Sequence, residues 1–314
     1  MKNITDLYSN NSTNVRFNDF SHQFKRLSLG TMGLLFPQKT RSTIKRMFFK
    51  PMRKPLSKSE QQWIDTGRNF QIKVGDKTIQ CWQWGEGPQI LAVHGWNGSA
   101  ANLNPFFNPL LEQGNSIVAF DAPAHGKSEG EQTNYFEITD TVRAMVNSIG
   151  KDSLAGIIAH SIGAAAVINC LSKESIHTKT ALIAPALKLK ELLFNTFEKN
   201  GVPNHLYTSI IAELEQEYGY SIERDNPYNL LEHLDSEVMI AHDRGDRMVS
   251  FTDASTIAGR NSNITFHATK GLGHKHILKD KHTVDAVLQY LTHFVAESSR
   301  GASVCLNRVH TAGA

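Results

Sequence analysis

The stretch that decides the fold is residues 157–166, IIAHSIGAAA, in which a short apolar run leads into Ser161 and then into small residues. This pattern predicts a buried strand that ends at the serine and a helix that begins directly after it. A serine in such a turn projects its hydroxyl from the sheet edge, at a helix N-terminus where free backbone N–H groups favour negative charge. Ser161 is therefore a candidate nucleophile; the alternative is a serine that only caps a helix.

Strand-like and helix-like segments alternate on both sides of this stretch. A hairpin is expected at residues 70–84 across Gly75 and Asp76, and further strands at residues 89–93, 116–120, 154–159, 180–184, 237–241 and 264–267. Helical patterns lie between them, at residues 99–113, 135–149, 161–173, 251–260 and 278–296. This alternation predicts an α/β fold with a mostly parallel, twisted sheet of about eight strands and helices on both faces.

Residues 187–232 interrupt the alternation because they contain helical patterns and no strand. An all-helical insertion between two strands of a parallel sheet predicts a small helical cap over the carboxyl edge, where such sheets bind ligands. Its apolar side chains either favour a substrate with an apolar acyl or aromatic group or only seal the cap onto the body: Leu192, Leu193, Phe194, Phe197, Ile210 and Ile211.

The chain carries its charge unevenly. The formal net charge is +3, but residues 1–58 alone carry twelve Lys or Arg against two acidic residues, so the remainder is net negative. We predict a basic N-terminal extension at residues 1–65, an α/β domain at 66–298 that includes the cap, and a flexible tail at 299–314.

The basic segment at residues 21–54 contains one clear amphipathic pattern, at Ile44, Met47 and Phe48, which Pro51 and Pro55 end. Either this helix packs on the body with a solvated basic face, or the segment contacts an anionic membrane surface. Nucleic acid is not expected, because no recognition motif accompanies the charge.

Composition indicates a cytoplasmic protein. The three cysteines, Cys81, Cys170 and Cys305, are odd in number and far apart, which favours a reducing compartment over a disulfide framework. We also expect no secretion signal, since the first residues run from Met1 and Lys2 directly into Asn, Thr and Asp.

Four further motifs surround the candidate serine in the sequence. HGWNG at residues 94–98 and DAPAHGKS at residues 121–128 each follow a predicted strand. An acidic region, VMIAHDRGDRMV, occupies residues 238–249, and a histidine region, TKGLGHKHIL, occupies residues 269–278. The chain thus supplies serine, acid and histidine in that order.

Together these motifs resemble the α/β-hydrolase superfamily, and the resemblance covers residues 68–296. It implies that Ser161 is the nucleophile, His274 the general base and then acid, and Asp246 the carboxylate that orients the histidine. It also implies an oxyanion hole made by the backbone N–H groups of Trp96 and Ile162. One departure is Ala159, which stands where the family's elbow usually has glycine.

Chemistry requires each of these groups independently of the resemblance. A serine hydroxyl is a poor nucleophile at neutral pH and needs an adjacent base, which histidine provides. A buried carboxylate fixes the imidazole tautomer. The resemblance implies a serine hydrolase that cleaves a carboxylic ester or thioester; the rivals are an acyltransferase, a carbon–carbon bond hydrolase and a non-catalytic binding protein.

Several neighbouring residues compete for these roles. Asp243 competes with Asp246, and His276 with His274; the family pattern favours Asp246 and His274. The other histidines near the motifs are expected to be structural: His94, His125 and His160. His242 with the two aspartates lacks a further ligand set for a metal. Without a phosphate-binding glycine loop, we expect no cofactor.

Overall fold

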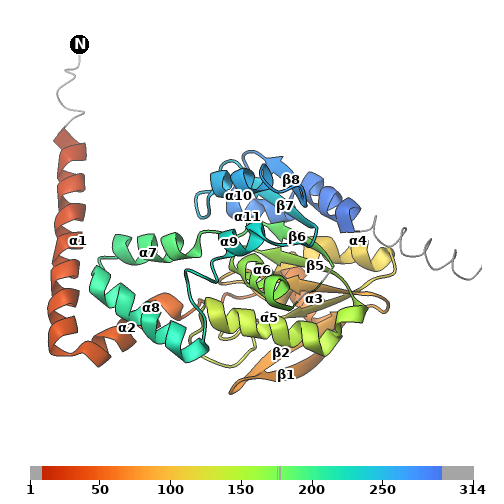
Figure 1. The fold of residues 1–314 in the computed structure, drawn as a ribbon, viewed down its shortest axis with the longest axis horizontal. Helices are drawn as coiled ribbons and strands as arrows, with labels where there is room; N and C mark the ends of the chain where they lie inside the picture. The colour runs from red at the N-terminus through yellow and green to blue at the C-terminus, as the bar shows by residue number, and fades with distance from the viewer. Residues whose placement is uncertain (1–8, 175, 177, 292–314) are drawn as a thin grey trace, which may run out of the picture. The chain divides into compact units, whose positions relative to one another are not determined.

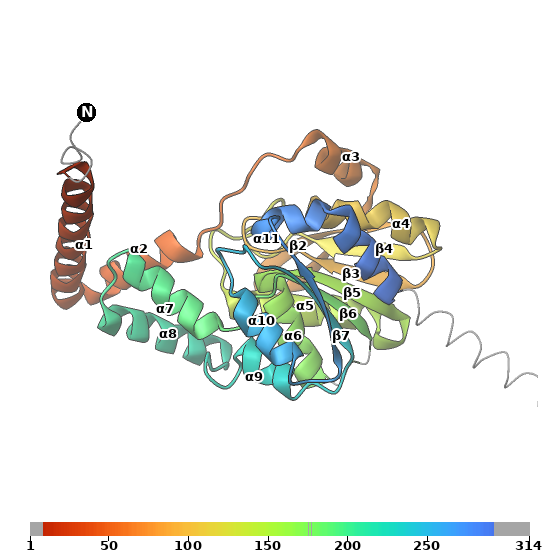
Figure 2. The same cartoon turned by 90° about the horizontal axis from the view of Figure 1, so that it is seen from above.

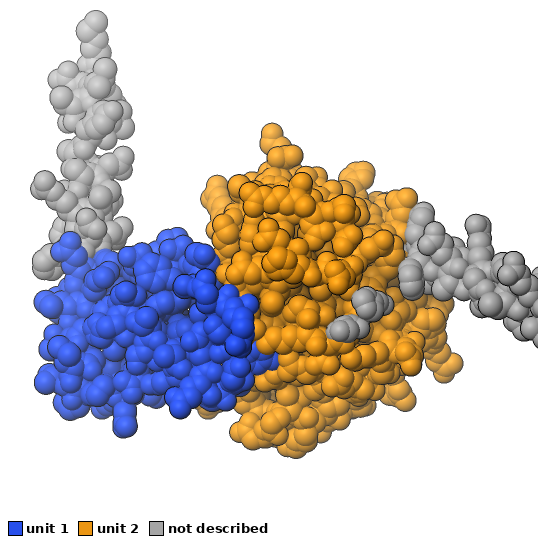
Figure 3. All heavy atoms as spheres, viewed as in Figure 1, with its two compact units in different colours: residues 1–50, 189–224 blue, residues 51–188, 225–314 orange. Residues whose placement is uncertain are grey.

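The computed structural model describes residues 9–174, 176 and 178–291 of the 314-residue chain, and side chains from residue 21 onward. The tail predicted at residues 299–314 lies outside this part. The chain divides into two compact units, Met1–Lys50 with Leu189–Arg224, and Pro51–Lys188 with Asp225–Ala314 (Figure 3). The N-terminal extension therefore groups with most of the insertion predicted as a cap. None of the described helices is long and apolar enough to cross a membrane.

The second unit contains one eight-stranded sheet (Figures 1 and 2). Its strands are β1 (Arg68–Val74), β2 (Lys77–Trp84), β3 (Gln89–Val93), β4 (Ser116–Phe120), β5 (Leu154–His160), β6 (Lys179–Ile183), β7 (Val238–Asp243) and β8 (Ile264–Thr269). They lie in the order β1-β2-β4-β3-β5-β6-β7-β8, with β2 antiparallel to β1 and β4 and the other pairs parallel. The predicted α/β fold with a mostly parallel sheet is confirmed.

Helices pack on both faces of the sheet. One face carries α3 (Lys58–Thr66), the 3₁₀ segment Ala100–Phe106, α4 (Phe107–Glu112) and a helix at residues 281–291, and the other carries α5 (Tyr135–Ile149) and α6 (Ile162–Glu174). Successive strand residues point to opposite faces. Trp82 and Trp84 accordingly join the first apolar cluster, whereas Cys81, directly before Trp82, contacts Met145 of α5.

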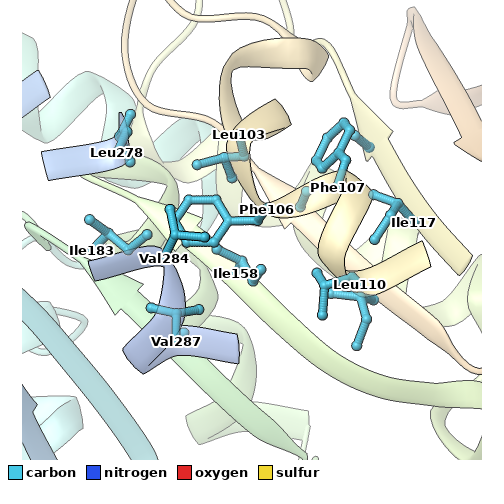
Figure 4. Close-up of a cluster of buried hydrophobic side chains, with 14 of the residues drawn as sticks. Leu103, Phe106, Phe107, Leu110, Ile117, Ile158, Ile183, Leu278, Val284 and Val287 are labelled. Carbon is cyan, nitrogen blue, oxygen red and sulfur yellow. The ribbon is translucent and has the colours of Figure 1, made fainter. Parts of the chain in front are cut away.

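The first of these faces buries a large apolar cluster, part of which is drawn in Figure 4. Its members come from strands and covering segments that lie far apart in the sequence: Leu103, Phe106, Phe107, Leu110, Ile117, Ile158, Ile183, Leu278, Val284 and Val287. Burying one such side chain fully stabilises a fold by about 1.5–3 kcal/mol. This packing joins the strands to the segments that cover them.

Side-chain caps set where several helices begin. The Asn134 side chain accepts hydrogen bonds from two backbone N–H groups at the start of α5, and Ser250 caps α10 (Phe251–Ala258) in the same way. Asn226 precedes α9 (Pro227–Glu232) as expected, but its side chain makes no capping bond. α11 (Gly273–His276) follows β8.

The first unit consists of α1 (Ser9–Leu35), α2 (Pro37–Phe49), α7 (Leu189–Lys199) and α8 (Asn204–Tyr218). Phe48 stacks on Phe197 with ring centroids 4.0 Å apart, and Glu213 of α8 pairs with Arg41 and Lys45 of α2. The predicted amphipathic helix around Ile44 is α2, whose Ile44 is fully buried. α1 was not predicted, because its first half shows little apolar periodicity.

Candidate active site

Ser161 occupies the turn between β5 and α6. Its backbone has φ +56°, in the left-handed region that non-glycine residues rarely adopt. Three hydrogen bonds hold this conformation: the Ser161 N–H donates to the Ile183 carbonyl (3.0 Å), and the Ser161 carbonyl accepts from Ala165 and Ala186 (3.2 Å each). A strained backbone conformation of this kind persists only where the surrounding contacts fix it. Here the conformation directs the Ser161 hydroxyl outward at the carboxyl edge of the sheet.

Two glycines let the loop after β3 approach this turn. A Cβ atom on Gly95 would lie 2.9 Å from the Ser161 Cβ, and one on Gly163 would lie 2.4 Å from the His94 carbonyl oxygen. Any side chain at either position would force backbone to move. Ala159, the residue in place of the usual glycine, is fully buried, so the fold accommodates its methyl group.

His274 and Asp246 complete a continuous hydrogen-bonded chain with the serine. The Nε2 atom of His274 lies 3.0 Å from Ser161 Oγ, and its Nδ1 atom lies 2.7 Å from Asp246 Oδ2. The other carboxylate oxygen of Asp246 accepts from the backbone N–H groups of Met248 (2.8 Å) and Val249 (3.1 Å). Because the carboxylate accepts the Nδ1–H, the unprotonated Nε2 faces the serine hydroxyl.

The Asp246 side chain is completely buried and yet charged. Burial alone would raise its pKa, but the adjacent His242 ring and the hydrogen bonds from His274 and from the Met248 backbone outweigh that effect. The pKa of Asp246 therefore lies well below its usual value.

Asp243, the competing acid, is used differently. One of its oxygens accepts from the Gly245 N–H (2.8 Å), and the other accepts from the Thr269 hydroxyl (2.8 Å) and the Leu272 N–H (3.0 Å). Burial raises the pKa of Asp243, but these bonds and one from the Gly273 backbone lower it to about 2. Asp243 thus braces the loop that carries His274 and does not contact the imidazole. His276, the competing histidine, is exposed on α11.

Two other histidines of the motifs tie loops together as neutral rings. The His94 Nδ1–H donates to the Gly95 carbonyl (2.7 Å) while Nε2 accepts from the Ala122 N–H (2.9 Å). His125 donates to the Pro123 carbonyl (2.9 Å) and accepts from the Asn97 N–H (3.1 Å). Burial lowers the pKa of His94 to about 4 and that of His125 to about 3.

His160 also holds a loop of the site. Its Nε2–H donates to the backbone carbonyl of His274 at 3.0 Å, and the two rings lie 4.7 Å apart. Burial lowers the pKa of His160 to about 3, so this donor stays neutral. His160 therefore positions the histidine loop relative to the elbow.

The two backbone groups predicted as an oxyanion hole both lie next to the elbow. Ile162 is the first residue of α6, and Trp96 follows the glycine that contacts Ser161. Neither N–H donates a hydrogen bond to the protein within the described part of the chain. Both remain available to an oxygen atom of a ligand. The Trp96 ring is fixed edge-on against His125, 5.3 Å away.

One contact at the site was not predicted from the sequence. The Nε2 atom of His242, a fully buried residue at the end of β7, lies 3.4 Å from Asp246 Oδ2. The contact exists because the chain turns back at Asp243, whose carbonyl accepts from the Asp246 N–H (3.1 Å). Sequence spacing carries no signal for that turn. Among the described residues, no group of three or more potential ligands is placed to hold a metal ion.

A sheet of this order, with a serine in a left-handed elbow after β5, an acid after β7 and a histidine after β8, is the arrangement of the α/β-hydrolase fold. The chain has that fold. A protein-family model described as serine aminopeptidase, S33, matches residues 88–225. A probable serine hydrolase of Drosophila melanogaster is 32% identical over 109 residues, 32% of this chain and 32% of that protein. The chain thus spans about a third of the length of the curated relative it matches.

Solved structures share the fold. An esterase of Pyrococcus furiosus superposes with a TM-score of 0.61 at 21% identity, over 78% of this chain and 98% of that one. A Butyrivibrio proteoclasticus protein solved with ferulic acid gives 0.57 at 17% identity, over 73% and 98%. A thioesterase domain from a curacin biosynthetic pathway gives 0.53 at 14% identity, over 72% and 99%.

Proposed function

We propose that the protein is a serine hydrolase that cleaves a carboxylic ester or thioester through an acyl-enzyme. The observation that carries this proposal is the hydrogen-bonded chain from Ser161 Oγ through His274 to Asp246, at 3.0 Å and 2.7 Å. It presents a hydroxyl, a base and an orienting carboxylate in contact range at one sheet edge.

In the first half of the reaction, His274 Nε2 takes the Ser161 proton as Oγ bonds to the substrate carbonyl carbon. The carbonyl oxygen becomes an oxyanion, which the N–H groups of Trp96 and Ile162 stabilise. Such a donor is worth about 2.7–4 kcal/mol in kcat. His274 then gives its proton to the leaving alcohol or thiol as the bond to it breaks.

In the second half, water replaces the leaving group. His274 takes a proton from the water as its oxygen attacks the acyl carbon, and returns a proton to Ser161 Oγ as the acyl–serine bond breaks. The buried negative charge of Asp246 stabilises the imidazolium in both halves. The product acid leaves and the serine is regenerated.

We propose a substrate with an apolar acyl or aromatic group. Ferulic acid, the molecule bound to one structural relative, is an aromatic acid. Leu192, Leu193 and Phe194 on α7 remain partly exposed, whereas Phe197, Ile210 and Ile211 are buried within their own unit and serve to seal it. We propose an anionic membrane surface as a second partner, through residues 21–54.

A series of p-nitrophenyl esters from acetate to palmitate tests the enzymatic proposal. The wild type is expected to release p-nitrophenol from at least one ester, and Ser161→Ala to lose at least about 10⁴-fold of that rate. Ser172→Ala is the matched control, since this serine lies on the same helix and, among the described residues, bonds only to the Asn169 carbonyl. Hydrolysis by Ser161→Ala at the wild-type rate would contradict the proposal. Analysis of products with added alcohol separates hydrolysis from acyl transfer.

A further inference from the structure

One face of α1 carries a row of large apolar side chains that are mostly exposed. Phe24, Leu27, Leu34 and Leu35 are 65%, 71%, 80% and 66% exposed. Their spacing of three, seven and one residues places them along one stripe of the helix, together with Thr31. The stripe extends over about 17 Å at 1.5 Å per residue. We call these four apolar residues the α1 ridge.

Small and polar residues make the closest contacts of α1 with its own unit, and Leu29 is half-buried. A Cβ atom on Gly33 would lie 2.9 Å from a Leu206 methyl group, so α1 packs closely on the start of α8 there. The His22 ring nitrogen Nε2 bonds to the Glu198 carbonyl at 2.7 Å. The contacts of α1 with its own unit thus involve Gly33 and His22, whereas the large apolar side chains of the α1 ridge are exposed.

The stretch of sequence that contains the ridge is basic. Residues 20–59 contain ten Lys or Arg and no Asp or Glu. Arg41 and Lys45 are neutralised by Glu213, and Arg53 donates to three backbone carbonyls in the second unit. Other bases of the first unit are exposed and have no ion-pair partner among the described residues: Lys25, Arg26, Lys39 and Arg46.

We infer that the α1 ridge inserts into the headgroup region of an anionic lipid membrane, with the unpaired bases of α1 and α2 binding the lipid charge. This inference rests on the proposed membrane partner and is independent of the proposed chemistry. Burial of apolar side chains together with attraction to anionic lipid is what holds a helix in a membrane interface. A second copy of the chain fits less well, because its ridge would bring an equally basic surface into contact with this one.

The structure distinguishes the two helices of residues 21–54. In α2, which carries the amphipathic pattern Ile44, Met47 and Phe48, Ile44 is fully buried and Phe48 stacks on Phe197. Only Met47 of the three is exposed, at 63%. α2 therefore supplies charge, through Lys39 and Arg46, and α1 supplies the apolar surface.

Flotation of the full chain with vesicles tests the inference. Vesicles of phosphatidylcholine alone are compared with vesicles that contain phosphatidylglycerol as well. The apolar variant carries Leu27→Ser, Leu34→Ser and Leu35→Ser, and its matched control carries methionine at the same three positions. The charge variant carries Lys39→Gln and Arg46→Gln, and its control carries Arg260→Gln and Lys270→Gln, two exposed bases of the second unit.

The wild type is expected to float with the anionic vesicles, and less so at high salt. The serine variant should lose about 100-fold in partitioning, while the methionine control should stay close to wild type. The charge variant should lose about fivefold for each charge removed, and its control should be unchanged. Circular dichroism checks that all variants keep their helices.

Three results would overturn the inference. One is wild-type binding by the serine variant, and another is equal binding of the wild type to both kinds of vesicle. The third is a dimer in light scattering that the serine substitutions dissociate, with no vesicle binding, which would assign the ridge to a second copy. Flotation measures binding alone, so none of these results bears on whether Ser161 is acylated.

Discussion

Replacing Asp246 by asparagine should leave the site folded and nearly inactive, and the hydrogen bonds explain why. Oδ1 of Asp246 accepts from two backbone N–H groups, those of Met248 and Val249. An asparagine keeps both bonds only if its oxygen takes that position. Its NH₂ group then faces His274 Nδ1, 2.7 Å away in the wild type. The imidazole must accept at Nδ1 and carry its proton on Nε2.

This tautomer cannot take the Ser161 proton, because Nε2 is already protonated. Loss of the correct tautomer in a serine–histidine–aspartate site lowers kcat by about 10⁴-fold. That factor corresponds to about 5.4 kcal/mol of transition-state stabilisation. The effect on stability should be much smaller, since the two backbone bonds are retained.

Asp243→Asn is the matched control, because Asp243 is equally buried but holds the loop and not the imidazole. In Asp243→Asn, the amide oxygen can keep the bonds from Thr269 and Leu272, but the NH₂ group then faces the Gly245 N–H. Because both of these groups are donors, one hydrogen bond is lost. We expect a loss of about 1–3 kcal/mol in the free energy of unfolding, with kcat reduced far less than in Asp246→Asn. Steady-state ester hydrolysis and urea unfolding measure the two effects. A larger kcat loss for Asp243→Asn would refute the assignment.

Two further predictions concern the surroundings of the site. Gly163→Ala places a methyl group 2.4 Å from the His94 carbonyl oxygen, so it should lower the free energy of unfolding by about 1–3 kcal/mol and reduce ester hydrolysis. Gly259→Ala, where a Cβ meets only ordinary contacts, should stay within about 0.5 kcal/mol; equal effects would contradict the account. The pKa of His160 is about 3 in the folded protein, below its unfolded value, so the unfolded chain binds more protons and stability falls as pH drops below about 6.5. Between pH 7 and pH 5 this histidine should account for about 2 kcal/mol of the loss. His160→Gln retains a donor for the His274 carbonyl but does not titrate between pH 7 and pH 5. Urea unfolding at both pH values should therefore show a smaller decrease in the free energy of unfolding than in the wild type. A decrease equal to that of the wild type would contradict the prediction.

Strands were predictable from the sequence because buried parallel strands are short, continuous apolar runs. β3 and β4 were predicted with the bounds observed, and the runs that lead into Ser161 and Asp243 identified β5 and β7. Parallel strands end at a common edge, so the serine, the acid and the histidine that follow three of them were expected to meet there. The structure brings Ser161, Asp246 and His274 together at that edge.

Other features depend on contacts that no local pattern encodes. α3 begins with a reciprocal cap between Ser57 and Glu60, a spacing visible in the sequence that was not used. The grouping of α2 with α7 arises from the stacking of Phe48 on Phe197, far apart in the chain. The family pattern favoured Asp246 over Asp243, but the contact of His242 with Asp246 depends on the turn at Asp243, which that pattern does not encode.

Labelling with a fluorophosphonate tests the central claim most directly, because the reagent reacts with a serine only when a neighbouring base activates it. Intact mass and peptide mapping should show a single adduct on Ser161 in the wild type. Labelling should be absent in Ser161→Ala and strongly slowed in His274→Ala, and it should be normal in Ser172→Ala. Equal labelling of the wild type and Ser161→Ala, or a wild type that does not react, would contradict the account.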